Sequence, residues 1–289
     1  MSFASYLLFL FISLIIRTLP RNLSLKIGKV IGKIIYKSFP VRKKVAKMNI
    51  DKSFPDLSEK ERLKILKDSY KHYGMVLIDF MRLKNINNSN INDIFIIDAE
   101  TKKCLENNKG AIMVTGHVGN WEYFSPLLGL NDFKFCIVAQ KIKNKFLNSY
   151  FNKSRTFKNI SIILKNQGTK PMIDALNKKY FLGLAADQNA GRRGLKVNFL
   201  NMKVSFPKGP SIFHIKTKKN ILFSYCVMNE KNKYIFKSKV LNLDMYDYND
   251  RNILQLITSK YSEELEKIIK QYPNQYFWFH KIQKKEIYR

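Results

Sequence analysis

The chain begins with an uninterrupted apolar run. Residues 3–16 (FASYLLFLFISLII) carry no charge, and their only polar members are Ser and Tyr. The run is shorter than the roughly 20 residues with which a helix crosses a bilayer. Extending it to residue 19 takes in Arg17, whose side chain can reach the interface. Cations follow the run instead of preceding it, and Pro20 and Arg21 do not resemble a cleavage site. The pattern favours a retained membrane anchor, with the following residues in the cytoplasm, over an ordinary buried core helix.

A second helical pattern runs from residue 23 to residue 36. Its apolar residues share one face of the predicted helix and its lysines share another. The apolar face holds Ile27, Val30, Ile31, Ile34 and Ile35, and the basic face holds Lys26, Lys29, Lys33 and Lys37. Such a helix can lie on an anionic leaflet or pack on its own domain, and the sequence leaves both possibilities open.

The rest of the chain alternates short apolar runs with helical patterns. Ser58 and Glu61 have the S-x-x-E form of a capping box, which predicts a helix from there to about residue 83. Strands are predicted at residues 94–97, 111–115, 133–138, 161–164, 181–185, 221–227 and 234–240, and further helices at 146–157, 170–178 and 252–272. This alternation is typical of an α/β domain, and the closeness of the last two strands predicts a mixed sheet. We therefore expect one α/β domain, residues 21–289, with a mixed central sheet covered by helices on both faces. A membrane-anchor helix of residues 1–20 precedes it.

Composition adds a strong positive charge to this picture. The 289 residues include 52 Lys+Arg and 22 Asp+Glu, which gives a net charge of +30. A hydrophobic content of 45% excludes a disordered basic tail. The charge predicts attraction to a polyanion, and the apolar start of the chain favours an anionic membrane over nucleic acid, for which no binding motif is present. Three widely spaced cysteines favour a reducing compartment. The four histidines lack metal-ligand spacing, so no metal is expected.

Residues 111–122 (AIMVTGHVGNWE) carry the clearest chemistry. An apolar strand ends at Thr115, a glycine-containing loop holds His117, and Glu122 lies in the first turn of a predicted helix. Ligands of α/β sheets bind where strands end in such loops. A carboxylate that accepts the Nδ1 proton of His117 would leave Nε2 free to take a proton from a hydroxyl. We therefore expect His117 to be a general base and Glu122 to be its orienting partner, the alternative being a turn histidine beside a solvated acid.

The same stretch resembles the first motif of the lipid A biosynthesis acyltransferases, the lauroyl/myristoyl branch of the lysophospholipid acyltransferase superfamily. Further blocks resemble that family in the same order along nearly the whole chain. They are Asn49 with residues 54–55 (FP), 186–188 (ADQ) with 191–194 (GRRG) and 199–200 (FL), 208–210 (KGP), and the closing 273–281 (PNQYFWFHK).

The resemblance implies transfer of a fatty acyl chain from acyl carrier protein, or from acyl-CoA, to a hydroxyl of a Kdo-bearing lipid A precursor. It implies that residues 21–289 are an acyltransferase domain at the cytoplasmic face of the cell inner membrane, in lipopolysaccharide biosynthesis. No cofactor beyond the acyl donor is implied. The expected partners are acyl carrier protein, the lipid A precursor and anionic membrane lipid.

The remaining candidate residues would bind substrate. The family often carries an Arg-Pro pair after its second core strand, where this chain has Gln140 and Lys141; either side chain could donate to the oxyanion of the thioester. Arg192 and Arg193, between glycines, suit bidentate binding of phosphate, the alternative being a solvated basic turn. In the adjoining block, Gln188 is a further substrate-binding candidate. Asp187 could orient Arg192 or serve as a structural acid.

Two other functions compete with this one. Within the superfamily, the chain could acylate a lysophospholipid. It could also be a basic peripheral membrane protein without chemistry, although that class gives no reason for the order of His117 and Glu122 around two glycines.

Overall fold

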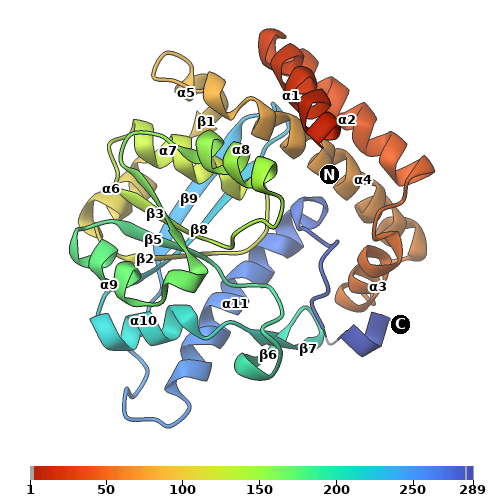
Figure 1. The fold of residues 1–289 in the computed structure, drawn as a ribbon. Coiled ribbons are helices and arrows are strands. Elements are labelled where there is room, and N and C mark those ends of the chain that lie inside the picture. The colour runs from red at the N-terminus through yellow and green to blue at the C-terminus, as the bar shows by residue number, and fades with distance from the viewer. Residues whose placement is uncertain (1–2, 284, 289) are drawn as a thin grey trace.

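A seven-stranded sheet, in the order β1-β9-β8-β2-β5-β3-β4, forms the centre of the molecule (Figure 1). The computed structural model describes residues 3–283 and 285–288. The strands are β1 (Phe95–Ile96), β2 (Ile112–Thr115), β3 (Phe135–Ala139), β4 (Ile160–Leu164), β5 (Phe181–Ala185), β8 (Ile221–Met228) and β9 (Tyr234–Val240). From β8 to β4 all neighbours pair in parallel, whereas β9 pairs antiparallel with β8. The expected α/β fold with a mixed sheet is confirmed.

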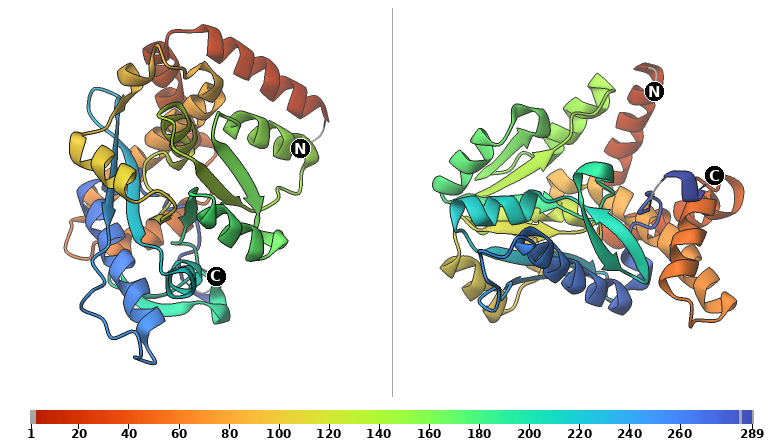
Figure 2. Two further views of the ribbon diagram at one scale, coloured as in Figure 1. Left: turned by 90° about the vertical axis from the view of Figure 1, so that its left-hand side faces the viewer. Right: turned by 90° about the horizontal axis from the view of Figure 1, so that it is seen from below.

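Helices cover both faces of this sheet (Figures 1 and 2). One buried cluster contains Leu105 of α6 (Ala99–Asn107) and Leu127 of α7 (Phe124–Leu130), and Phe151 of α8 (Lys145–Arg155) packs against it. A second cluster contains Leu176 of α9 (Lys170–Asn177), Phe213 of α10 (Gly209–Thr217) and Leu265 of α11 (Ile253–Gln271). Strand residues alternate between the two clusters because successive side chains point to opposite faces.

Four further helices precede the first strand in the described part of the chain, and a very short one, α5 (Ile91–Ile94), leads into β1. They are α1 (Phe3–Thr18), α2 (Arg21–Ser38), α3 (Lys43–Ser53) and α4 (Glu59–Met81). The predicted capping box is present at the start of α4, where Ser58 and Glu61 bond each other's backbone. Helix α2 crosses α4 at three glycines, so closely that a Cβ atom on Gly32 would lie 2.1 Å from the carbonyl oxygen of Tyr70.

Helix α1 corresponds to the predicted anchor, whose residues 1–2 lie outside the described residues. One face packs on the domain, since Phe9 contacts the ring of Tyr150 and the hydroxyl of Ser13 bonds that of Tyr150 at 2.8 Å. Across the helix, Leu8, Phe11 and Leu14 are about 60% exposed (60%, 61% and 60%). In the described part of the chain, no helix combines the length and the apolarity needed to cross a membrane.

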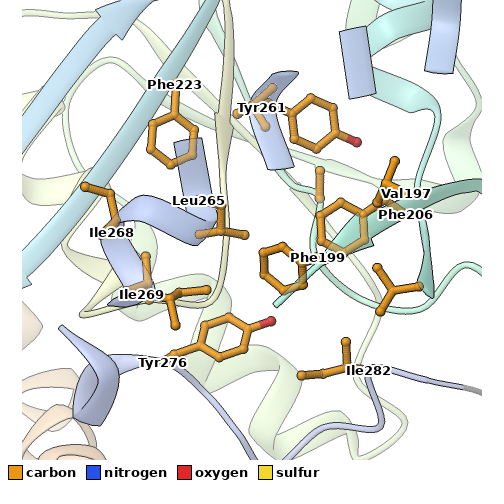
Figure 3. Close-up of a cluster of buried hydrophobic side chains, with 14 of the residues drawn as sticks. Val197, Phe199, Phe206, Phe223, Tyr261, Leu265, Ile268, Ile269, Tyr276 and Ile282 are labelled. Atoms are coloured by element: carbon orange, nitrogen blue, oxygen red, sulfur yellow. The ribbon is translucent and has the colours of Figure 1, made fainter. Parts of the chain in front are cut away.

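Sequence patterns did not predict the hairpin of β6 (Leu195–Phe199) and β7 (Met202–Phe206) or the short helices α3, α5, α6 and α10. The helix expected to hold Glu122 in its first turn is present as the 3₁₀ turn Trp121–Tyr123 followed by α7. The hairpin packs on α11, and Figure 3 shows Phe199 and Phe206 in the same aromatic cluster as Tyr261 and Tyr276. After α11, the chain turns at Pro273–Gln275 and runs back along the end of β2. This return brings the closing segment of the chain to the loop that holds His117.

Candidate active site

The loop after β2 is fixed by its backbone. Gly119 has φ +64°, and a Cβ atom there would lie 1.9 Å from the carbonyl oxygen of Cys226, so only glycine fits. The amide of Gly119 donates to the carbonyl of Gln275 at 2.8 Å, and the amide of Phe277 donates to the carbonyl of His117 at 2.9 Å. The hydroxyl of Tyr73 also donates to the His117 carbonyl, at 3.1 Å. The backbone of the loop at His117 is thus held by Tyr73 of α4 and by residues 275–277 of the closing segment.

Asp187 binds His117 with both carboxylate oxygens. Oδ1 lies 2.6 Å from Nδ1 of His117, and Oδ2 accepts the backbone N–H of His117 at 2.8 Å. The Asp187 side chain is fully buried and that of His117 is 16% exposed. When the Nδ1–H of His117 donates to Asp187, Nε2 carries the lone pair, which accepts from the amide nitrogen of Gln188 at 3.3 Å. This is the tautomer that a general base requires.

The pKa values of the pair move apart. Burial alone would lower the pKa of His117, but the charge and hydrogen bond of Asp187, with a smaller contribution from Glu122, raise it above its ordinary value. Burial would likewise raise the pKa of Asp187, yet the neighbouring His117 holds it well below its usual range. Asp187 therefore stays ionised while His117 changes protonation.

Glu122 is not the orienting partner of His117, so that expectation is wrong. Its carboxylate is bound by both Nε and Nη2 of Arg155, at 2.7 and 2.5 Å. The reason is the position of Asp187: Thr115 pairs with Ala185 across β2 and β5, so His117 and Asp187, each two residues further on, leave the sheet side by side. Glu122 lies one 3₁₀ turn away and faces Arg155 of α8.

A cavity of about 610 Å³ lies at these strand ends. His117, Glu122 and Arg155 line it, together with Gln140 and Gln188. Most of its remaining lining is apolar, from β3, β5, α7 and α10. The His117 side chain, whose Nδ1 is taken up by Asp187, therefore borders a large cavity with mainly apolar walls.

Comparison with known proteins decides the family. A model described as bacterial lipid A biosynthesis acyltransferase matches residues 2–285. This chain belongs to that family. It is 25% identical over 126 residues to a phosphatidylinositol mannoside acyltransferase of Mycolicibacterium smegmatis and 24% identical over 121 residues to one of Mycobacterium tuberculosis H37Rv. These matches cover 42% and 40% of this chain, and 41% and 38% of those two relatives.

A solved structure, that of the 1-acyl-sn-glycerophosphate acyltransferase from Thermotoga maritima, aligns with a TM-score of 0.38 at 11% identity. The alignment covers 85% of this chain and 97% of that one.

The other expected substrate-binding residues of this chain are exposed. Arg192 and Arg193 occupy an exposed 3₁₀ turn between Gln188 and β6, and Lys141 is exposed at the end of β3. Among the described residues, none of these three belongs to the cavity lining. The described residues that line the cavity therefore form an inner part around His117, and these three cations lie outside its lining.

Sequence patterns missed three residues in or beside this inner part. Arg155, which binds Glu122, lies 33 positions further along the chain, where no local pattern marks it. The hydroxyl of Tyr276 lies 3.3 Å from Nε2 of His280, and burial together with the neighbouring Asp187 carboxylate raises the pKa of Tyr276. Burial lowers the pKa of His280 to about 4, so this ring is neutral beside the pair. The closing block of the family resemblance contains both Tyr276 and His280 and was the available signal.

Proposed function

We propose that this acyltransferase moves a fatty acyl chain from a thioester of acyl carrier protein, or of CoA, to a hydroxyl of a Kdo-bearing lipid A precursor. The observation that carries the proposal is the His117–Asp187 pair, with Nε2 of His117 turned to a large apolar cavity. A base that faces a cavity with no protein nucleophile bonded to it suits direct attack by the acceptor hydroxyl.

In this reaction, Nε2 of His117 removes the acceptor proton as the hydroxyl oxygen attacks the thioester carbonyl. The negative charge of the tetrahedral intermediate lies on the former carbonyl oxygen, and the Gln140 amide at the cavity wall is available to donate to it. The intermediate collapses by breaking the carbon–sulfur bond. The leaving thiolate takes the proton from imidazolium, which restores neutral His117. Asp187 stabilises the imidazolium and stays ionised.

The acceptor is proposed as a glycolipid. The family description names lipid A, and the mycobacterial relatives are named for phosphatidylinositol mannosides. Both acceptors combine sugars with an anionic group. Arg192 and Arg193 on the exposed turn would bind the phosphates of the lipid A precursor as planar forks. No cofactor beyond the acyl donor enters the reaction.

The place of reaction is proposed as the cytoplasmic face of the inner membrane. Helix α1 presents an exposed apolar face, which would leave water by inserting into the apolar part of the membrane interface. The net charge of +30 would hold the protein to anionic lipid and attract an acidic acyl carrier protein.

The test is an acyl transfer assay with purified protein, acyl carrier protein thioester as donor, and two acceptors, a Kdo-bearing lipid A precursor and a lysophospholipid. We expect transfer to the precursor, and we expect His117→Ala to lower kcat by roughly 10²–10⁴-fold. His214→Ala is the matched control, because His214 bonds Lys219 and Tyr248 outside the cavity lining. Preference for the lysophospholipid would favour the glycerolipid reaction, and full activity of His117→Ala would exclude the mechanism.

A further inference from the structure

The cavity is lined from both faces of the sheet. Phe135 and Ile137 belong to the side covered by α7 and α8, whereas Val138 and Leu184 belong to the side covered by α9 and α10 (Figure 1). Gly183 pairs with Ile137 across β3 and β5, which places it on the α7 side. The cavity therefore wraps around the carboxyl ends of β3 and β5, and its two parts lie on opposite faces.

The two parts differ in chemistry. On the α7 side the walls are aromatic and aliphatic, with Phe124, Phe135 and Phe151 among them, and the charges of Glu122 and Arg155 neutralise each other. On the α9 side the lining also has apolar members such as Met172 and Phe213, but Lys165, Thr169 and Gln188 interrupt it. An alkyl chain gains by leaving water for the aromatic part, and each buried methylene is worth roughly a fourfold change in an equilibrium constant.

Phe135 lines the aromatic part far from the carboxyl edge of the sheet. It is the first residue of β3, the lining position of that strand most distant from the carboxyl edge, and only 4% of it is exposed. Its ring lies on the bare Cα of Gly183, where an added Cβ would come within 2.4 Å of Cζ and 2.5 Å of Cε2. The ring of Phe124 contacts it, with the centroids 6.2 Å apart. The ring of Phe135 can therefore occupy this position only because residue 183 has no side chain.

We propose that Phe135, seated on Gly183, sets the length of the acyl chain that this enzyme transfers. The proposal rests on the acyl transfer proposed above and adds the residues that select the donor. A chain that ends at the ring fills the aromatic part. A longer one would leave methylenes in water or displace the ring, and a shorter one would leave the end of the cavity without contacts.

Two substitutions should move the preference in opposite directions. Phe135→Leu removes part of the wall and should move the optimum to longer donors. Gly183→Ala forces the ring toward the cavity and should move it to shorter ones. The double variant Gly183→Ala/Phe135→Leu gives the smaller side chain room beside the new methyl group and should return the optimum toward that of the wild type. Leu184→Ala is the matched control, since Leu184 is adjacent in sequence and lines the other part.

The experiment is a competition assay with mixed even-chain thioesters of acyl carrier protein, read by mass spectrometry of the acylated precursor. The ratio of products gives the ratio of kcat/KM values and does not depend on the amount of folded enzyme. A change of about fourfold or more per methylene in opposite directions for the two single variants supports the proposal. An unchanged ratio for a folded Phe135→Leu, or an equal shift for Leu184→Ala, overturns it. Failure of the wild type to transfer any donor would instead overturn the proposed function.

Discussion

At the residue scale, the protonation of His117 controls the proposed reaction. A general base acts in its neutral form, so kcat/KM should rise with pH through the pKa of His117, which Asp187 raises above the ordinary value of about 6.5. Asp187→Asn removes the negative charge, so the pKa of His117 falls and the rising limb moves to lower pH. The maximal rate should also fall by roughly 10²–10⁴-fold, because an amide does not hold the same tautomer.

The measurement is the pH profile of kcat/KM for the two enzymes, with Glu122→Gln as the comparison. Glu122 makes only a smaller contribution to the raised pKa of His117, so its variant should move the limb less than Asp187→Asn does. A limb that stays in place in Asp187→Asn, or moves to higher pH, would show that another group titrates.

The sequence identified the residues of the site more readily than it identified which carboxylate bonds His117. His117 and Glu122 belong to one short stretch, and that proximity suggested the wrong partner. Asp187 lies 70 positions away from His117. It becomes the partner through the parallel register of β2 and β5, in which Thr115 faces Ala185. The register of β2 against β5 depends on how whole strands pack, so it cannot be deduced from the residues around His117 alone.

At the element scale, the crossing of α2 and α4 depends on glycine. A Cβ atom on Gly32 would meet backbone atoms of Tyr70 and Lys71 within 2.7 Å, and backbone cannot move as a side-chain tip can. Gly32→Ala should therefore separate the helices and lower the free energy of unfolding by roughly 1–3 kcal/mol. Gly209→Ala is the control, since nothing lies within 4 Å of its added Cβ. Thermal and urea unfolding measure both, and equal stability of the two variants would contradict the close packing.

The same scale explains which elements the sequence could predict. Long periodic helices such as α4 and α11, and apolar strands such as β2, carry strong patterns, and their predicted positions are confirmed. The hairpin of β6 and β7 and the short helix α10 lie between glycines and prolines, and tertiary contacts with α11 and the sheet hold them. Local pattern is weakest where packing decides the structure.

At the scale of the whole molecule, the proposed membrane binding combines the apolar face of α1 with the positive charge. Leu8, Phe11 and Leu14 are exposed on a helix whose opposite face packs on α8. Their substitution by Gln should weaken binding to vesicles of anionic phospholipid by on the order of 100-fold and leave the fold intact, because each inserted side chain contributes about 1 kcal/mol or more. Met245→Gln, which changes an apolar side chain that is 73% exposed on a loop, is the control and should bind as the wild type does.

The binding that remains in the triple variant would come from lysines such as Lys26 and Lys29, so it should decline as salt is added. Vesicle flotation at low and high salt separates the two contributions. Binding of the triple variant at the wild-type level would mean that α1 does not meet the membrane, and the charge would then have to hold the enzyme there alone.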